Sequence, residues 1–192
     1  MFLGFTGPNA SGKGEAIKYL VEKHKFVSYS LSDILRSELK SRGVEINRDN
    51  LISVGNELRE KHGPGVLAKL AVEKIKNMPQ AIVDSIRNPS EIEELRKNLK
   101  DFKLIGINAD TKVRYERAGK RGRENENRMS YEEFIANEQK ENSKAQTVDR
   151  IIEKKTWTKK RILTIAGIVG IVGLVAASWF FTSGKSRLNV DT

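Results

Sequence analysis

The sequence predicts an α/β fold built on a mostly parallel sheet, followed by one membrane-spanning α-helix. Two observations predict it. Short apolar runs alternate with longer amphipathic stretches through the first 145 residues, which is the pattern of strands connected by helices. Residues 162–181 then contain no charged side chain, and this segment is long enough to cross a lipid bilayer as a helix.

Four short apolar runs are bounded by turn residues, which is typical of strands buried on both faces. The first, "MFLGFT", leads directly into a glycine-rich turn, and each later run is separated from the one before by a helical stretch. Because the connections are helical, we expect parallel strands with ligands at their carboxyl ends. The expected strands are residues 1–6, 26–30, 81–86 and 102–109.

Amphipathic periodicity and capping signals place the helices between and after these strands. Ser32 is expected to cap the second helix, and Pro64 to lie near the start of the fourth. Ser130 and Glu133 have the spacing of a capping box for the last helix. The expected helices are residues 14–23, 32–40, 49–61, 64–77, 88–99, 110–122 and 130–142.

The composition limits the classes of partner. The net charge is +10, from 35 basic and 25 acidic residues, and the chain has no cysteine. Disulfides and thiolate metal sites are therefore excluded. The basic surplus of the first 150 residues is spread out, and no arginine-rich run with interleaved aromatics occurs. We therefore expect phosphorylated small molecules, and not nucleic acid, as the partners of this part.

The uncharged segment at 162–181 predicts a single-pass transmembrane helix, with a buried core helix as the alternative. More basic residues precede the segment than follow it, so the N-terminal part is expected in the cytoplasm and the tail outside. The segment also resembles the membrane anchor of an exported adaptor protein, and its small residues allow helix–helix self-association. The expected divisions are a domain at 1–145, a basic linker at 146–161, the membrane helix at 162–181 and a tail at 182–192.

The stretch "GPNASGKGE" has the glycine and lysine spacing of a phosphate-binding loop, or P-loop. It follows an expected strand and opens an expected helix, so its backbone amides and the helix N-terminus can bind phosphates. Lys13 can reach the β- and γ-phosphates of ATP. The alternative is a glycine-rich turn without a ligand. The residues expected to bind the phosphates of ATP are Gly7, Pro8, Asn9, Ala10, Ser11, Gly12, Lys13, Gly14 and Glu15.

Phosphoryl transfer from ATP requires Mg²⁺, and a Ser or Thr directly after the loop lysine usually supplies one ligand. Gly14 stands at that position and has no hydroxyl group. Glu15 is the next residue, and Asp84 lies near the end of the third expected strand. We expect Glu15 and Asp84 to hold Mg²⁺, largely through water. The alternative for Glu15 is an acid that only favours the start of the helix.

Four motifs in order, "GPNASGKGE", "SDILRSEL", "DSIRNPSEIEELR" and "RYERAGKRGR", resemble the nucleoside-monophosphate-kinase group of P-loop proteins. Within that group the sequence is similar to a family described as dephospho-CoA kinase-like or as AAA-family ATPases. The resemblance covers residues 1–145 and implies the three-layer sandwich of P-loop NTPases, with ATP and Mg²⁺ as ligands. The family continues into a further strand and helix. That strand is expected to be missing here, unless "TVDRII" supplies part of it.

The resemblance also implies acceptor-binding residues. Asp33 and Arg36 match the Asp-x-x-Arg of adenylate kinases, whose arginine holds the acceptor phosphate through two donors. Arg87 follows Asp84 by three residues, where adenylate kinases have four, and is expected to bind the acceptor as well. The alternative for Arg36 is a surface ion pair with Asp33 or Glu38.

An arginine-rich stretch after the fourth expected strand resembles the lid helix of these kinases, which closes over the donor nucleotide. Three of its arginines fall on one helix face, where a triphosphate would balance their charge. The alternative is neutralisation by Glu116 and Glu124. The expected lid residues are Arg114, Arg117, Arg121 and Arg123, and the expected catalytic residues are Lys13, Asp84, Arg117 and Arg121.

Together these features predict an ATP-dependent nucleotide kinase of the nucleoside-monophosphate type, tethered to a membrane. Dephospho-CoA is the alternative acceptor. The second hypothesis is a membrane-anchored nucleotide-binding module with weak or no catalysis. The missing last strand favours that module, whereas the full set of arginines favours the kinase.

Overall fold

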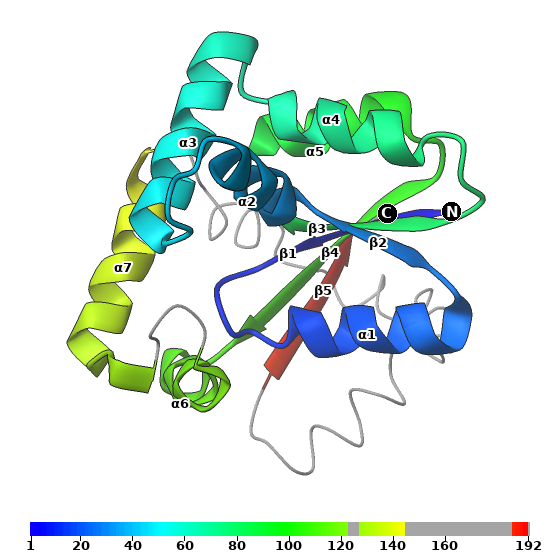
Figure 1. Cartoon of the computed structure of the whole chain (residues 1–192). Helices are drawn as coiled ribbons and strands as arrows, with labels where there is room; N and C mark the ends of the chain where they lie inside the picture. Colours follow the sequence, from blue (N-terminus) through cyan, green and yellow to red (C-terminus); the bar gives the residue numbers. More distant parts are fainter. Residues whose placement is uncertain (123–126, 145–185, 192) are drawn as a thin grey trace.

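The computed structural model describes residues 1–122, 127–144 and 186–191 of the chain (Figure 1). Its sheet has the strand order β2-β3-β1-β4-β5. β1, β2, β3 and β4 are parallel, and β5 runs antiparallel to β4. The expected α/β fold with a mostly parallel sheet is therefore confirmed. The strands are β1 Phe2–Thr6, β2 Val27–Ser30, β3 Ala81–Ile86, β4 Phe102–Ala109 and β5 Ser186–Asp191.

The helices lie where the sequence places them, with shifts of a few residues at their ends. The capping box of the last helix is confirmed, because the backbone N–H of Ser130 donates to Glu133 at 2.7 Å and that of Glu133 donates to the Ser130 hydroxyl at 3.2 Å. The helices are α1 Lys13–His24, α2 Leu31–Ser41, α3 Arg48–His62, α4 Val66–Ile75, α5 Pro89–Asn98, α6 Thr111–Arg121 and α7 Tyr131–Lys144.

The start of α2 differs from the prediction. β2 leads into this helix without a loop, so Ser30, the last residue of the strand, stands at the N-cap and Ser32 lies within the helix. The hydroxyl of Ser30 makes no capping hydrogen bond and donates to the Ser85 hydroxyl at 3.3 Å. The prediction that Ser32 caps α2 is wrong, because the helix begins at Leu31, directly after the strand.

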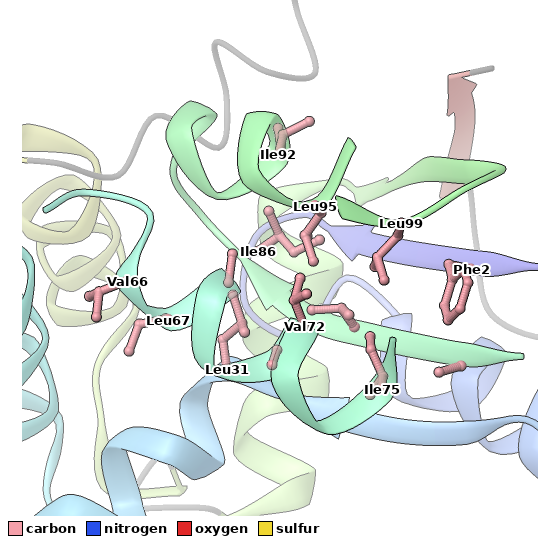
Figure 2. Packing of buried hydrophobic residues seen from close by; sticks show 14 of the residues in the cluster. Phe2, Leu31, Val66, Leu67, Val72, Ile75, Ile86, Ile92, Leu95 and Leu99 are labelled. Carbon is pink, nitrogen blue, oxygen red and sulfur yellow. The ribbon is translucent and has the colours of Figure 1, made fainter. Parts of the chain in front are cut away.

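Two apolar layers hold the sheet, one on each face. On one face α1 packs against alternate residues of the central strands, including Leu3, Ile82 and Ile105. On the other face α2, α4 and α5 cover Phe2, Val83 and their neighbours (Figures 1 and 2). Successive side chains of a strand point to opposite faces, so a strand buried on both faces must be apolar throughout. This explains why β1, β3 and β4 appear in the sequence as largely apolar runs. β2 lies at the edge of the sheet and is exposed or half-buried along its length, so the expectation that it is buried on both faces is wrong.

The carboxyl ends of β1 and β3, which are neighbours in the sheet, position the site. β1 is central, and the chain passes from it through the P-loop into α1 on one face of the sheet, while α2, α4 and α5 lie on the other (Figure 1). The Thr6 hydroxyl donates to the carbonyl of Ile86 at 2.8 Å and so fixes the carboxyl ends of β1 and β3 to each other. In doubly wound sheets this end of the strands is where ligands bind.

The stretch "TVDRII", considered as part of the family's last strand, lies outside the described residues, so the absence of that strand stays a prediction. The sheet nevertheless has a fifth strand. Ser186–Asp191 occupies the position beside β4, but antiparallel to it and from a segment that the sequence placed in a tail across a membrane. Residues 146–161 and 162–181, the expected linker and membrane helix, lie outside the described residues, and both stay predictions. Among the helices that the structure describes, none combines the length and apolar character that a bilayer crossing requires.

Candidate functional site

The loop between β1 and α1 has a backbone that only glycine allows at two positions. Gly7 has a φ of +141°, and a Cβ atom there would lie 2.0 Å from the carbonyl oxygen of Ile107 on β4. Gly12, at the N-cap of α1, has a φ of +105°. These angles belong to the region that L side chains seldom adopt. The glycines therefore let the loop pass close to β4 and turn into α1, as a phosphate-binding loop requires.

Lys13 places its ammonium group inside this loop. Its Nζ donates to the carbonyl oxygens of Gly7 at 2.8 Å and Pro8 at 2.9 Å, and to the Ser11 hydroxyl at 3.4 Å. The positive charge thus lies beside the N-terminus of α1, whose backbone N–H groups and dipole also attract anions. The loop, the lysine and the helix end together form a site for the phosphates of a nucleotide.

The P-loop forms the floor of a cleft of about 970 Å³. Segments of α2, α3, α6 and the end of β3 complete its walls, so residues far apart in the sequence meet there. Eight cationic and three acidic side chains line it, which makes the cleft strongly attractive to anions. The residues of the predicted site that line the cleft are Asn9, Ala10, Ser11, Gly12, Lys13, Gly14, Glu15, Asp33, Arg36, Asp84, Arg87, Arg117 and Arg121.

Asp84 lies at an irregular point of β3. The register between β1 and β3 shifts between Gly4 and Thr6, and Ser85 has a φ of +64°. Such bulges re-aim a side chain and are frequent beside active sites. Oδ2 of Asp84 accepts a hydrogen bond from the Ser85 hydroxyl at 3.3 Å, whereas Oδ1 is buried and has no hydrogen-bond partner among the described residues. A buried carboxylate oxygen without a partner suits a cation.

Asp84 and Glu15 fit a Mg²⁺ ion that is also bound by phosphate oxygens and water. In the described part of the chain, no group of three or more His, Cys, Asp or Glu side chains could hold a metal ion. Mg²⁺ in nucleotide sites does not need such a group, because phosphate oxygens and water fill most of its positions. Asp84 supplies the buried oxygen, and the exposed Glu15 lies on the rim of the same cleft. Both are thus available to an ion bound to ATP.

Neighbouring atoms do not require a glycine at position 14. A Cβ atom built there would have no atom within 4 Å, and its φ lies outside the left-handed region. A serine would therefore fit at this position. The lack of a hydroxyl after the loop lysine is a feature of the sequence that the fold itself does not require.

The acceptor residues of the prediction line one wall of the cleft. Arg36 donates to Asp33 at 3.1 Å, one turn away on α2, with a third of its side chain exposed. Glu38, the other partner considered for Arg36, instead pairs with Arg42 at 2.8 Å. The ion pair with Asp33, which was the alternative for Arg36, therefore exists, and Arg36 also lines the cleft. Its role in binding an acceptor stays a prediction.

Two of the four expected lid arginines lie elsewhere or outside the described residues. Arg114 is buried and does not line the cleft; it pairs with Glu138 of α7 and donates to the carbonyl of Ala109 at 2.9 Å. Its guanidinium joins α6 to α7 and also donates to the carbonyl of Asn9 in the P-loop at 3.4 Å. That it faces a triphosphate stays a prediction. Arg123 falls within 123–126, outside the described residues.

The other two arginines of α6 face the P-loop. Arg121 donates to the side-chain carbonyl of Asn9 at 3.0 Å. Arg117 lines the same part of the cleft, and burial lowers the pKa of its guanidinium from the ordinary value. A bound anion would oppose that shift, since it favours the charged form. α6 therefore presents two cations to the loop that would hold the phosphates.

Sequence reasoning missed several residues of the cleft: Arg48, Arg59 and Lys120 also line it. Glu91 lies beneath it, fully buried, and pairs with Arg59 at 3.0 Å. In the sequence Glu91 has the position of a helix-start acid, and it does complete a capping box with Asn88. Its second role depends on α3 lying beside α5, which no local pattern reports.

Comparison with known proteins agrees with this geometry. The family model described as "AAA domain" matches residues 6–135, which include the P-loop, Asp84 and α6. A UPF0200 protein of Pyrococcus abyssi is 35% identical over 147 residues, covering 73% of this chain and 78% of the relative. A UPF0200 protein of Sulfurisphaera tokodaii is 38% identical over 124 residues, covering 65% and 68%.

The chain belongs to the UPF0200 family. This UPF0200 protein also has a fold like that of a solved structure from Chloroflexus aurantiacus described as a candidate kinase. The TM-score is 0.52 with 17% sequence identity, over 72% of this chain and 75% of the other. At that identity the likeness concerns the fold alone. The UPF0200 protein is thus a P-loop nucleotide-binding domain with a kinase-like fold.

Proposed function

We propose that this UPF0200 protein is a Mg²⁺-dependent kinase that transfers the γ-phosphoryl group of ATP to a small phosphorylated acceptor, with a nucleoside monophosphate as the first candidate. One observation carries the proposal. The cleft at the P-loop is lined by arginines from two separate parts of the fold: Arg117 and Arg121 come from α6, and Arg36 and Arg87 come from α2 and the loop after β3 (Figure 1). A protein that only binds ATP has no use for the second pair of arginines.

The arrangement suits an in-line transfer. Lys13 and the loop amides would hold the β- and γ-phosphates, and Arg121 and Arg117 would balance the charge that spreads over the γ-oxygens. An oxygen of the acceptor forms a bond to the γ-phosphorus while the bond to the bridging oxygen breaks, and ADP leaves. An acceptor phosphate is already deprotonated at neutral pH, so this step needs no general base.

Mg²⁺ would neutralise charge on the β- and γ-oxygens, and Asp84 and Glu15 are the residues proposed to hold it. The protein's remaining contribution is positioning. Arg36 and Arg87 would orient the acceptor so that its oxygen lies in line with the bond that breaks.

The test is release of ADP by the full chain with Mg²⁺ and ATP, measured against a panel of nucleoside monophosphates and dephospho-CoA. We expect at least one acceptor to stimulate release, and Lys13→Met to abolish the stimulation. Lys18→Met, an exposed position on the same helix, is the matched control. ATP binding without stimulation by any acceptor would favour the second hypothesis, a nucleotide-binding module.

A further inference from the structure

Arg59 of α3 is the least explained cation of the cleft. Its side chain is only 8% exposed although it lines the cleft wall, and its Nη2 donates to Oε1 of Glu91 at 3.0 Å. Glu91 has a side-chain exposure of 1%. A long cationic side chain in such a place is held in one orientation, so it has lost its rotamer freedom before any ligand arrives.

Glu91 fixes Arg59 next to the acceptor wall. The second oxygen of this carboxylate, Oε2, accepts the backbone N–H groups of Arg87 at 2.9 Å and Asn88 at 3.1 Å. One buried carboxylate thus joins the side chain of Arg59 to the backbone of Arg87. The two arginines approach the cleft from different elements, α3 and the loop after β3, but they share a single anchor.

Arg59 has more donors than the protein uses. A guanidinium has five N–H donors. Among the described residues, the hydrogen bond to Glu91 is the one that Arg59 makes, and its buried Nε has no partner there. Donors that are left unpaired in a buried place cost free energy, which an anionic ligand would restore.

The charges of the residues around Arg59 also favour an anionic ligand. Arg36, Arg48, Arg59 and Arg87 all line the part of the cleft formed by α2, α3 and the loop after β3, where Asp33 is the one acid on α2 or α3 that lines the cleft. Aliphatic side chains, including Leu51 and Leu67, line the same cleft. A single phosphate bound by Arg36 and Arg87 would leave the guanidinium of Arg59, whose Nε has no partner among the described residues, without a ligand contact.

We propose that the acceptor carries two anionic groups, one bound by Arg36 and Arg87 and the second bound by Arg59. The inference rests on the proposed kinase function and narrows its acceptor to compounds with two phosphate or carboxylate groups joined by a short apolar spacer. Arg59 is then a residue that selects the substrate, and Glu91 is the residue that positions it.

The test compares ligands with one and two charged groups. The full chain is first saturated with Mg²⁺ and a non-hydrolysable ATP analogue, so that the P-loop is filled. Calorimetry then measures binding of methylphosphonate and of bisphosphonates with one to four methylene groups between the phosphonates. We expect the best bisphosphonate to bind about tenfold more tightly than methylphosphonate, since one charge-assisted contact is gained.

The variant must not leave a buried charge behind. Arg59→Met alone would strand Glu91, so the informative protein is the double variant Arg59→Met with Glu91→Gln, which removes both charges and keeps an oxygen for the backbone of Arg87 and Asn88. We expect it to bind methylphosphonate as before and to lose the preference for the bisphosphonate. Arg42→Met, at the C-cap of α2 and outside the cleft, should keep the preference.

Each other result overturns the inference. A wild-type protein that binds no bisphosphonate better than methylphosphonate has no second anion position. A double variant that weakens both ligands equally shows that Arg59 only shapes the wall, and one that keeps the preference shows that another residue binds the second group. Failure of the ATP analogue to bind contradicts the proposed function itself, and the inference falls with it.

Discussion

The two walls of the cleft hold their arginines in different ways. On the acceptor wall the partners are carboxylates: Arg36 pairs with Asp33, and Arg59 with Glu91. On the α6 wall, Arg121 donates to the neutral amide of Asn9 in the P-loop. Ion pairs fix a cation more firmly than a neutral hydrogen bond does. The buried pair of Arg59 with Glu91 is therefore the firmly held one, whereas the pair of Arg36 with Asp33 is largely exposed and the hydrogen bond of Arg121 goes to a neutral group.

α6 itself contains an arginine in an ion pair and an arginine bonded to a neutral amide. Arg114 is buried in an ion pair with Glu138, while Arg121, two turns further along the helix, is exposed at the cleft. One end of the helix is thus fixed to α7 and the P-loop, and the other end lines the cleft. Four predictions separate these roles, in order of the expected change in free energy.

Arg114→Met should have the largest effect, on stability. It leaves the carboxylate of Glu138 half-buried without its partner, so the free energy of unfolding should fall by about 3–5 kcal/mol, measured by chemical denaturation. Adding Glu138→Gln should restore much of the loss. A fall below about 1 kcal/mol would mean that the pair is a surface contact and not the joint between α6 and α7.

Arg121→Met should affect catalysis and not stability. We expect kcat to fall about a hundredfold with little change in the KM of the acceptor, because the contact is strongest when charge spreads over the transferring group. Lys112→Met, exposed at the start of the same helix, is the control. A change confined to acceptor KM would move Arg121 to the acceptor wall and break the contrast between the two walls.

Arg36→Met should show the reverse split. The KM of the acceptor should rise about tenfold and kcat should change less, since the arginine binds a group that does not react. Steady-state kinetics with Arg42→Met alongside would measure this. If kcat alone fell, Arg36 would have to contact the transferring phosphoryl group.

Gly14→Ser should have the smallest effect. The position has room for a side chain, so the fold should tolerate it. The Mg²⁺ concentration that gives half-maximal activity should fall roughly threefold, because the hydroxyl replaces one water ligand of the ion. Gly119→Ser, which also has nothing within 4 Å of its Cβ, is the control for the change of residue type. An unchanged Mg²⁺ dependence would mean that Glu15 and Asp84 leave no position for the hydroxyl.

Local pattern was sufficient for the strands and for the P-loop. β3 and β4 match the expected residues 81–86 and 102–109, because a short apolar run between turn residues has few other stable arrangements. The P-loop was equally accessible, since its glycines meet steric demands that are visible in the spacing. Most residues of the predicted site line one cleft for the same reason: they follow the carboxyl ends of parallel strands.

Contacts between segments that are distant in the sequence could not be predicted from local patterns. Nothing near Glu91 in the sequence indicates that Arg59, thirty-two residues earlier, will share its carboxylate. Likewise Arg114 and Arg121 share one helix face in the sequence, and the ion pair of Arg114 with Glu138 depends on the position of α7. The pairing of β5 with β4 is the extreme case, because it joins segments that begin at residues 102 and 186.

That last pairing has a consequence for synthesis of the protein. β4 is complete when residue 109 leaves the ribosome, yet residues 186–191 must still be made before its outer edge has a partner. At roughly 5–20 residues per second, the delay is on the order of 4–15 s. During that time an apolar strand presents unpaired N–H and C=O groups, the template on which another nascent chain can add. The yield of folded protein should therefore depend on chaperones and on expression temperature more than its stability would indicate.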